Sequence, residues 1–285
     1  MSNTIGIVGI GLVGTALSEL LIKAGYTVGG YDIRAEQNLV LANLGGRAHH
    51  SAADVFKQYP QVILSLPTSD DVRKVLGDAV PGSLIIDTST GDPADSREFG
   101  DRLSARGVAY VDATLGGSSK QIRNREAICI CGGSEEAFTR AESVLAIIAA
   151  RVFHVGPCGA GASMKLVLNL ALGLHRAVLA EALTYADACG IDPAQALEIL
   201  KAGPAYSKAM DVKGAKMLSA NYEPEARLTQ HLKDVRLILE TGARHEAWLP
   251  LSDQHRVLLE LAEAAGFGAS DNSAVIEAYR KENRR

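Results

Sequence analysis

The sequence predicts an α/β domain built on a doubly wound parallel sheet, followed by an all-α C-terminal domain. Short β-rich runs alternate with helical segments over roughly the first 155 residues, which is typical of a parallel sheet with helices on both faces. The turn-rich stretch from Gly156 to Gly161 ends this pattern, and strand signals disappear beyond it. We therefore expect two domains, 1–162 and 163–285, both near common domain sizes.

The first βαβ unit is predicted within the N-terminal 32 residues. Thr4 to Val8 is a short β-rich run, and Thr15 to Ala24 has apolar residues at helical spacing. Gly25 is a candidate for the helix C-cap. A second strand, Tyr26 to Tyr31, then leads to Asp32.

The following elements continue the alternation. Further strands are predicted at Val62 to Leu66, Leu84 to Asp87, Val108 to Val111 and Ala127 to Cys131. In the last of these, the thiols of Cys129 and Cys131 should lie on one face. In the second half, Ser163 to Cys189 predicts one long helix that ends at Gly190, and Asp192-Pro193 opens the next helix.

Composition favours an ordinary soluble enzyme. Hydrophobic residues make up 47% of the 285 residues, and 29 basic against 33 acidic residues give a net charge of −4, without a basic block for nucleic acid. The four cysteines match neither a zinc site nor a redox pair, so we expect reduced thiols. The N-terminus shows no basic segment followed by a cleavable apolar one, so we expect no signal peptide, and no uninterrupted apolar run approaches the ~18 residues of a membrane helix. We expect a cytoplasmic protein.

A glycine-rich turn, Gly9-Ile10-Gly11-Leu12-Val13-Gly14, joins the first strand to the first helix. Gly9 permits the tight turn, Gly11 lets a pyrophosphate approach the backbone, and Gly14 lets helix and strand pack closely. The pyrophosphate then lies at the helix N-terminus, where free amides and the helix dipole favour negative charge. The motif therefore predicts a Rossmann dinucleotide site that includes Leu12 and Val13.

The acid that ends the second strand narrows the choice of dinucleotide. Asp32 lies 18 residues after Gly14, where a carboxylate can accept hydrogen bonds from ribose hydroxyls and repel a 2′-phosphate. We therefore expect NAD as the cofactor. Arg34 can soften that preference, so NADP stays possible.

Five further segments, in order along the chain, resemble motifs of the β-hydroxyacid dehydrogenase family, which includes 3-hydroxyisobutyrate dehydrogenase. They are Leu66-Pro67 with Val72 and Val75, Asp87-Thr88-Ser89-Thr90 with Pro93, Asp112 to Ser118, the glycines before Lys165 and Asn169, and Lys233-Asp234. The resemblance extends from Ile5 to about Leu239.

The resemblance implies a role for each matching residue. Leu66, Pro67, Thr90 and Lys233 would contact the cofactor, whereas Gly116, Gly117, Ser118 and Asn169 would bind substrate and Lys165 would be catalytic. It also implies that the helical domain binds substrate and forms oligomers, and that no metal takes part. Hydride would pass between NAD(P) and a small 3-hydroxy acid or its semialdehyde.

Two segments depart from the family pattern, and the first departure concerns substrate choice. Gly116 replaces a serine whose hydroxyl helps to hold the acid group, and Ser118 replaces a glycine. Ser118 or Ser119 can supply a hydroxyl from a nearby position. Leu170 stands where the family often has another polar residue. Candidate substrates include 3-hydroxyisobutyrate, glycerate or tartronate semialdehyde, and a longer or sulfonated hydroxy acid.

Lys165 and Asn169 are spaced to share one face of the long helix. We expect that face at the interdomain cleft, a common place for ligands. A lysine ammonium can donate a proton to a forming alkoxide and stabilise its charge, and a desolvated lysine can take the proton in the reverse direction. The amide of Asn169 can orient the substrate.

Other polar candidates have weaker support. His154 is expected to be structural, His175 to pack or lie at an interface, and His49-His50 lacks the partners of a zinc site. Arg123 can meet a substrate anion, and Trp248 is expected in the core or at an interface.

Two other functions stay open. An imine reductase of the same architecture usually has Asp or Tyr where Lys165 stands, and a non-catalytic dinucleotide-binding protein would not need Lys165, Asn169 and Thr90 together. The apolar surface of the Ser163 to Cys189 helix predicts a homodimer or homotetramer through the C-terminal domains.

Overall fold

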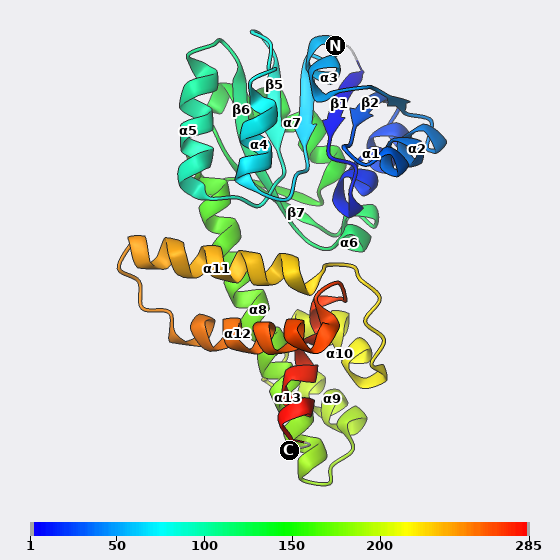
Figure 1. Cartoon of the computed structure of the whole chain (residues 1–285), viewed down its shortest axis with the longest axis vertical. Helices are drawn as coiled ribbons and strands as arrows, with labels where there is room; N and C mark the ends of the chain where they lie inside the picture. The colour runs from blue at the N-terminus through cyan, green and yellow to red at the C-terminus, as the bar shows by residue number, and fades with distance from the viewer. Residues whose placement is uncertain (1–2, 284–285) are drawn as a thin grey trace. The chain divides into compact units, whose positions relative to one another are not determined.

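The computed structural model describes residues 3–283 and divides the chain into two compact units, Met1–Lys165 and Leu166–Arg285. The division falls inside one helix, just after Lys165, and each unit is described by itself. The first unit holds the sheet and its helices, and the second is helical (Figure 1).

The first unit contains an eight-stranded sheet with the order β3-β2-β1-β4-β5-β6-β7-β8. The chain reverses its direction of travel across the sheet after β3, so the next strand, β4, lies on the other side of β1. The strands are β1 (Thr4–Val8), β2 (Thr27–Tyr31), β3 (Arg47–Ala48), β4 (Gln61–Leu64), β5 (Leu84–Asp87), β6 (Ala109–Gly116), β7 (Ile128–Gly132) and β8 (Arg151–His154). The α/β class with a doubly wound sheet is confirmed.

The predicted parallel sheet contains one antiparallel pair near one edge. Strand β7 pairs antiparallel with β6, and β8 is parallel to β7. The connection between β6 and β7 carries only the five-residue helix α6 (Ser119–Arg123), so the chain returns beside the strand that it has just left. Strand β6 also runs to Gly116, well beyond the predicted end at Val111.

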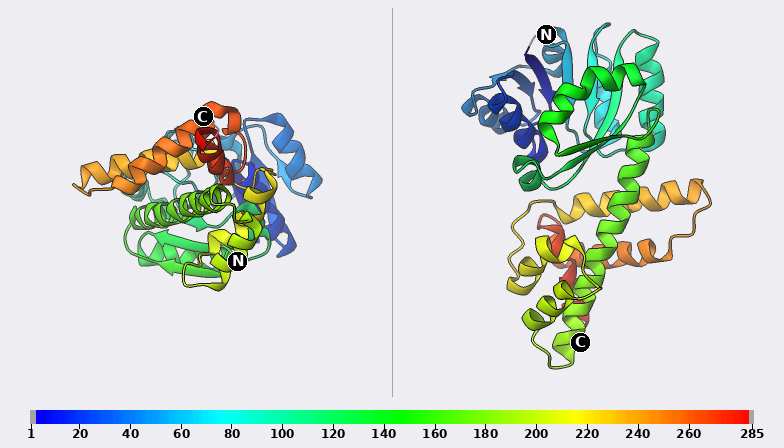
Figure 2. Two further views of the ribbon diagram at one scale, coloured as in Figure 1. Left: turned by 90° about the horizontal axis from the view of Figure 1, so that it is seen from below. Right: turned by 180° about the vertical axis from the view of Figure 1, so that it is seen from behind.

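Helices cover both faces of the sheet (Figures 1 and 2). Leu17, Leu41 and Leu145 place α1, α2 and α7 on one face, and Phe56 and Phe99 place α3 and α5 on the other. Besides α6, the helices that lie wholly in this unit are α1 (Leu12–Lys23), α2 (Ala35–Asn43), α3 (Ala52–Gln58), α4 (Ser69–Leu76), α5 (Pro93–Ser104) and α7 (Glu135–Ile148).

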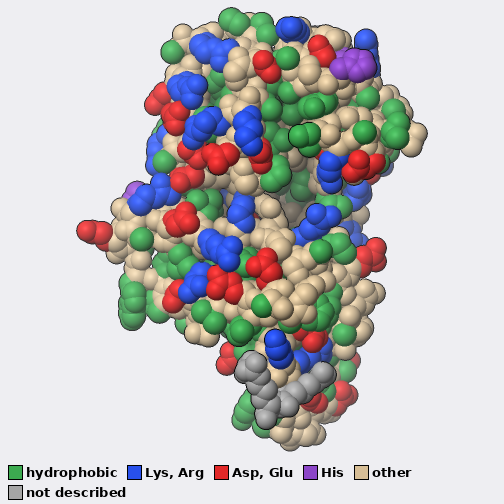
Figure 3. All heavy atoms as spheres, in the orientation of Figure 1, with side chains coloured by type: hydrophobic (Ala, Val, Ile, Leu, Met, Phe, Trp, Pro, Cys, Tyr) green, Lys and Arg blue, Asp and Glu red, His purple; other side chains and the backbone are tan. Residues whose placement is uncertain are grey.

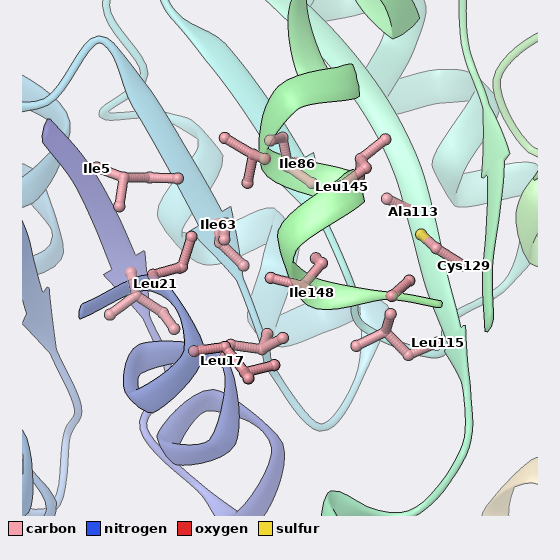
Figure 4. Close-up of a cluster of buried hydrophobic side chains, with 14 of the residues drawn as sticks. Ile5, Leu17, Leu21, Ile63, Ile86, Ala113, Leu115, Cys129, Leu145 and Ile148 are labelled. Atoms are coloured by element: carbon pink, nitrogen blue, oxygen red, sulfur yellow. The ribbon is translucent and has the colours of Figure 1, made fainter. Parts of the chain in front are cut away.

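Figure 4 shows the core on the first of these faces. Ile5, Ile63 and Ile86 of the parallel strands point toward Leu17 of α1 and Leu145 of α7, and all are fully buried. This burial on both faces explains why the strands are continuous apolar runs.

The thiols of Cys129 and Cys131 lie on one face of β7, as predicted, with their sulfur atoms 3.4 Å apart and both side chains buried. Cys158 and Cys189 are free thiols as well. All four cysteines are unpaired in the structure, and their reduced state in the cell stays a prediction.

The second unit is helical, as predicted. Gly190 adopts a positive φ of 75° after the long helix, and the side chain of Asp192 caps the next helix by accepting a hydrogen bond from the Ala194 amide. The elements are α8 (Ala160–Ala188), which begins in the first unit, α9 (Pro193–Ala202), α10 (Lys208–Ser219), α11 (Leu228–Arg244), α12 (Pro250–Ala262), η1 (Glu263–Phe267), η2 (Asn272–Val275) and α13 (Ile276–Asn283).

Helix α8 is long and apolar enough to cross a membrane by length and composition alone, with 29 residues and a hydropathy of 1.5 over its most apolar window. The criterion of an uninterrupted apolar run missed it because Lys165, Asn169 and Arg176 break the run. These three polar side chains are buried, as is 44% of that window. Core helices of soluble proteins pass the same test, so this finding is weak support for a membrane span.

Acidic and basic side chains alternate over α4 and α5 on the face drawn in Figure 3. Arg73 pairs with Asp95 and Glu98, and Arg102 also pairs with Glu98. This face therefore presents mixed charge, unlike the single-sign patch that binds nucleic acid.

Candidate cofactor and active site

The glycine turn between β1 and α1 has the shape that a bound diphosphate needs. Gly9 has a φ of +91°, and a Cβ atom at Gly14 would lie 2.0 Å from the Gly9 carbonyl oxygen. Helix α1 begins at Leu12, and its N-cap, Gly11, supplies no side-chain cap. The first amides of α1 are therefore left for an anion, so these residues fit the pyrophosphate of a dinucleotide.

Asp32 lies directly beside this turn and is only 7% exposed. Its carboxylate accepts a hydrogen bond from the Ile10 amide at 2.7 Å and another from the Arg34 amide at 2.9 Å. The Arg34 guanidinium pairs with the same carboxylate at 3.3 Å, and it lies 3.8 Å from where a Cβ atom of Gly11 would be. An acidic and a basic side chain therefore lie side by side where a Rossmann site is expected to bind the adenosine ribose.

The loops that follow β4 and β5 are tied together at the same edge of the sheet. The Leu66 amide donates to the Ser89 hydroxyl at 2.9 Å, and the Thr88 hydroxyl donates to the Leu64 carbonyl at 2.7 Å. Pro67 and Thr90 follow in these two loops. Because β1, β4 and β5 are parallel neighbours, their carboxyl ends place these residues in line with the glycine turn, where α/β sheets bind ligands.

The predicted substrate residues follow the end of β6. Gly116 is the last residue of the strand, and a Cβ atom at Gly117 would lie 2.9 Å from that of Ala127. The Ser118 hydroxyl accepts a hydrogen bond from the Gln121 amide at 3.4 Å and caps α6. Ser118 therefore has a local structural role, which sequence reasoning did not detect.

Lys165 lies against this same strand. Its side chain is 8% exposed, and its Nζ donates to the carbonyl oxygen of Leu115 at 2.5 Å. Leu115 immediately precedes Gly116. A buried ammonium is costly unless it is hydrogen-bonded, so a contact at this position indicates a specific role.

In the helical unit, Asn169 belongs to a small polar network. Its amide nitrogen donates to Asp234 Oδ2 at 2.9 Å, and Lys233 Nζ lies 3.0 Å from Asp234 Oδ1. Asn169 and Asp234 are both buried. The network holds the Asn169 amide in a fixed orientation and gives Lys233 an ion-pair partner.

A second buried cluster lies further along α8, and nothing in the sequence pattern indicated it. The Arg176 guanidinium lies 2.8 Å from His231 Nε2, and the rings of His231 and His255 are 5.2 Å apart. A Cβ atom at Gly173 would lie 2.6 Å from both rings. Burial, and then the charge of Arg176, lower the pKa of His255 to about 4.

The structure shows the contacts or the exposure of three residues that had weaker support as functional residues. Arg123 forms a bidentate pair with Glu19 at 2.7 and 3.1 Å, so the suggestion that it meets a substrate anion is not supported. His154 is structural, as predicted, because it contacts the Gly133 carbonyl and stacks on Phe138. Trp248 is 89% exposed, which rules out the core alternative of its prediction, and its place at an interface stays a prediction.

Comparisons with known proteins place the chain in a family. Residues 4–156 match the NAD binding domain of 6-phosphogluconate dehydrogenase, and residues 159–279 match the NAD-binding domain of NADP-dependent 3-hydroxyisobutyrate dehydrogenase. The two matches define an NAD(P)-binding oxidoreductase with a Rossmann domain. The chain belongs to the β-hydroxyacid dehydrogenase family, of the 3-hydroxyisobutyrate dehydrogenase type.

Individual proteins of this family are similar to the chain in sequence and in structure. L-threonate dehydrogenase of Cupriavidus necator is 30% identical over 98% of this chain and 97% of its own length. The structure of 3-hydroxyisobutyrate dehydrogenase from Salmonella typhimurium superposes with a TM-score of 0.88 at 27% identity, covering 96% of this chain and 99% of that chain. An imine reductase from Pseudomonas sp. has a TM-score of 0.66 at 20% identity, covering 97% and 99%, and shares the fold alone.

Proposed function

We propose that this chain is an NAD(P)-dependent dehydrogenase of small 3-hydroxy acids, or a reductase of their semialdehydes, with Lys165 as the general acid and base. The observation that carries the proposal is the buried ammonium of Lys165 at the Leu115 carbonyl, one residue before Gly116. The acid/base group thus lies beside the residues proposed to bind substrate. The family relationship supports the same reaction class.

The chain's own residues can perform the proton transfer. When bound, the nicotinamide exchanges a hydride with the substrate carbon. In reduction, the Lys165 ammonium donates a proton to the carbonyl oxygen as that carbon gains the hydride; in oxidation, the neutral amine takes the hydroxyl proton. Its low exposure strengthens the electrostatic stabilisation of the developing alkoxide. Asn169, held by Asp234, orients the substrate.

NAD is the proposed preferred dinucleotide. Asp32 directly follows β2 beside the glycine turn, where its negative charge disfavours a 2′-phosphate. The Arg34 guanidinium partly neutralises that carboxylate, so we expect measurable activity with NADP as well. The predicted cytoplasmic location remains a proposal.

A substrate panel tests the proposed function. Short 3-hydroxy acids, including 3-hydroxyisobutyrate, glycerate, threonate and a sulfonated analogue, are supplied with NAD and separately with NADP, and formation of the reduced cofactor is measured. We expect turnover of at least one acid, with a higher kcat/KM for NAD. Tight NAD binding without turnover of any acid would instead favour a non-catalytic dinucleotide-binding protein. In a parallel assay with cyclic imines and the reduced cofactor, turnover of the imines but of no acid would favour an imine reductase.

We also propose that the helical unit forms a homodimer or homotetramer. Val178 and Tyr185 on α8 are 63% and 70% exposed, and Trp248 and Leu251 near the start of α12 are 89% and 68% exposed. Large apolar side chains that are exposed in a single chain commonly mark a protein interface. A groove of about 630 Å³ around Trp248, between α11 and α12, contains none of the proposed site residues.

Light scattering at micromolar concentration tests this assembly. We expect a mass of two or four chains, and replacing Val178 and Tyr185 with charged residues should shift the mass toward that of one chain. The exposed Lys57 of the first unit, changed to Glu, serves as a control that keeps the mass. A monomeric unmodified protein would contradict the proposal.

A further inference from the structure

Asp112 on β6 holds the first turn of α8. Its side chain is 2% exposed, Oδ1 accepts a hydrogen bond from the Gly159 amide at 2.9 Å, and Oδ2 accepts one from the Ala162 amide at 2.7 Å. Amides in the first turn of a helix lack partners within the helix, and a carboxylate there also interacts favourably with the helix dipole. Both oxygens of Asp112 are therefore used by one helix end.

The backbone segments around Asp112 are packed so closely that Gly161 and Gly132 have no room for a side chain. A Cβ atom at Gly161 would lie 2.7 Å from the Asp112 carbonyl oxygen and from the Gly132 amide. A Cβ atom at Gly132 would lie 2.5 Å from Asp112 Oδ1. The Thr114 hydroxyl adds a hydrogen bond to the Gly161 carbonyl at 3.3 Å. The start of α8 thus lies directly on β6 and β7.

The same strand meets α8 a second time, at the active-site lysine. Lys165 is three residues after Ala162 on the helix, and Leu115 is three residues after Asp112 on the strand. The contact between Lys165 Nζ and the Leu115 carbonyl is therefore adjacent to the contact made by Asp112. Any shift of the first turn of α8 along β6 would move the ammonium away from Gly116.

We infer that Asp112 is a positioning residue for Lys165: its carboxylate fixes the first turn of α8 on β6 and so sets where the ammonium meets the substrate. The inference rests on the role proposed for Lys165. Asp112 itself takes no part in proton transfer, because both of its oxygens are bound by backbone amides.

The ionisation of Asp112 makes this arrangement sensitive to pH. Burial raises its pKa to about 6; the charge of Asp87 on β5 adds to the rise, and the two amide hydrogen bonds oppose it. The other titratable groups facing it are Tyr110 on β6, Cys129 on β7 and Cys158 before α8. Below about pH 6 the carboxyl takes a proton, and its hydroxyl oxygen becomes a poor acceptor for an amide. One of the two hydrogen bonds should then weaken.

The test is Asp112→Asn, assayed in the direction of carbonyl reduction, where acid alone does not deprive Lys165 of its donor proton. We expect kcat to fall by about ten- to a hundredfold, as for small misplacements of catalytic groups, with NADH affinity unchanged. We also expect kcat of the unmodified enzyme to fall below about pH 6, and this fall to be absent in the variant. A variant with unchanged kcat, or one that keeps the same acid limb, would overturn the inference.

A matched control and a second measurement complete the design. Asp192→Asn removes the carboxylate that caps α9, where it accepts from the Ala194 amide at 3.0 Å, and should leave kcat and its pH profile unchanged. Hydrogen exchange of residues 157–166 in the unmodified protein, corrected for intrinsic rates, should speed up below about pH 6. Constant protection across that range would refute the role of Asp112 even if the variant fails to fold. If no hydroxy acid is turned over, the proposed function fails, and hydrogen exchange still tests the contact.

Discussion

We expect replacement of Lys165 with alanine to remove turnover and to leave NAD binding nearly intact. The ammonium is the proposed proton donor and lies on α8, whereas the dinucleotide is expected on the glycine turn between β1 and α1. General acid–base groups contribute roughly 10²–10⁴-fold to rate, and loss of the buried positive charge adds to that effect, so we expect kcat to fall at least about 10³-fold. Steady-state kinetics and calorimetric titration with NAD measure the two quantities separately.

Two further variants sharpen this result. Lys165→Arg keeps the positive charge but cannot release a proton near neutral pH, so oxidation of the hydroxy acid should be lost. Lys57→Ala removes an exposed lysine from the same unit and should keep kcat within about twofold. Near-normal kcat in Lys165→Ala would rule out the proposed acid/base role.

The stability of the helical unit should fall as the pH drops below about 6.5, because His255 must then take a proton beside Arg176. Its pKa is lowered to about 4 in the folded protein, so the unfolded chain binds more protons between pH 6.5 and 4. The stabilisation is therefore complete above the unfolded pKa and is lost as the pH falls toward the folded value. Linkage gives a loss of roughly 2 kcal/mol between about pH 7 and pH 5.

Urea unfolding followed by far-UV circular dichroism measures this loss. His255→Gln should remove most of the difference in unfolding free energy between about pH 7 and pH 5, since Gln cannot take the proton. His175→Gln is the matched control, because His175 is exposed on α8 and its loss should leave the pH dependence unchanged. Comparing variants cancels the titration of all other groups. Equal pH dependence in the His255 variant and the unmodified protein would disprove the role of His255.

The sequence predicts the fold well where the physics is local. A positive φ favours glycine at Gly9 and Gly190, and a side-chain cap requires a residue such as Asp192. The turn and the helix ends at these positions can therefore be predicted from the local sequence alone. The direction of β7 is different, because the α6 connection between β6 and β7 looks like any other helix–turn segment in sequence. Strand β8 is half-buried and short, so its pattern is weak.

The candidate site also contains residues that the sequence predicts and residues that only the tertiary structure brings together. The glycine turn and Asp32 are predicted from their spacing at the ends of the first two strands, whereas the role of Lys165 is predicted from the resemblance to the family. Arg176, His231 and His255 come from three helices, and only tertiary packing brings them together. Arg123 shows the opposite error: its place after the substrate motif suggested an anion site, but Glu19, far earlier in the chain, is its partner.

Trp248 has a practical consequence beyond its place outside the core. It is the only tryptophan of the chain and is 89% exposed in a single copy, so excitation that is selective for tryptophan reports on one known surface position. Its emission maximum and its accessibility to a soluble quencher report directly whether that surface is covered. Dissociation of the proposed oligomer on dilution can therefore be followed by the tryptophan fluorescence of the unlabelled protein.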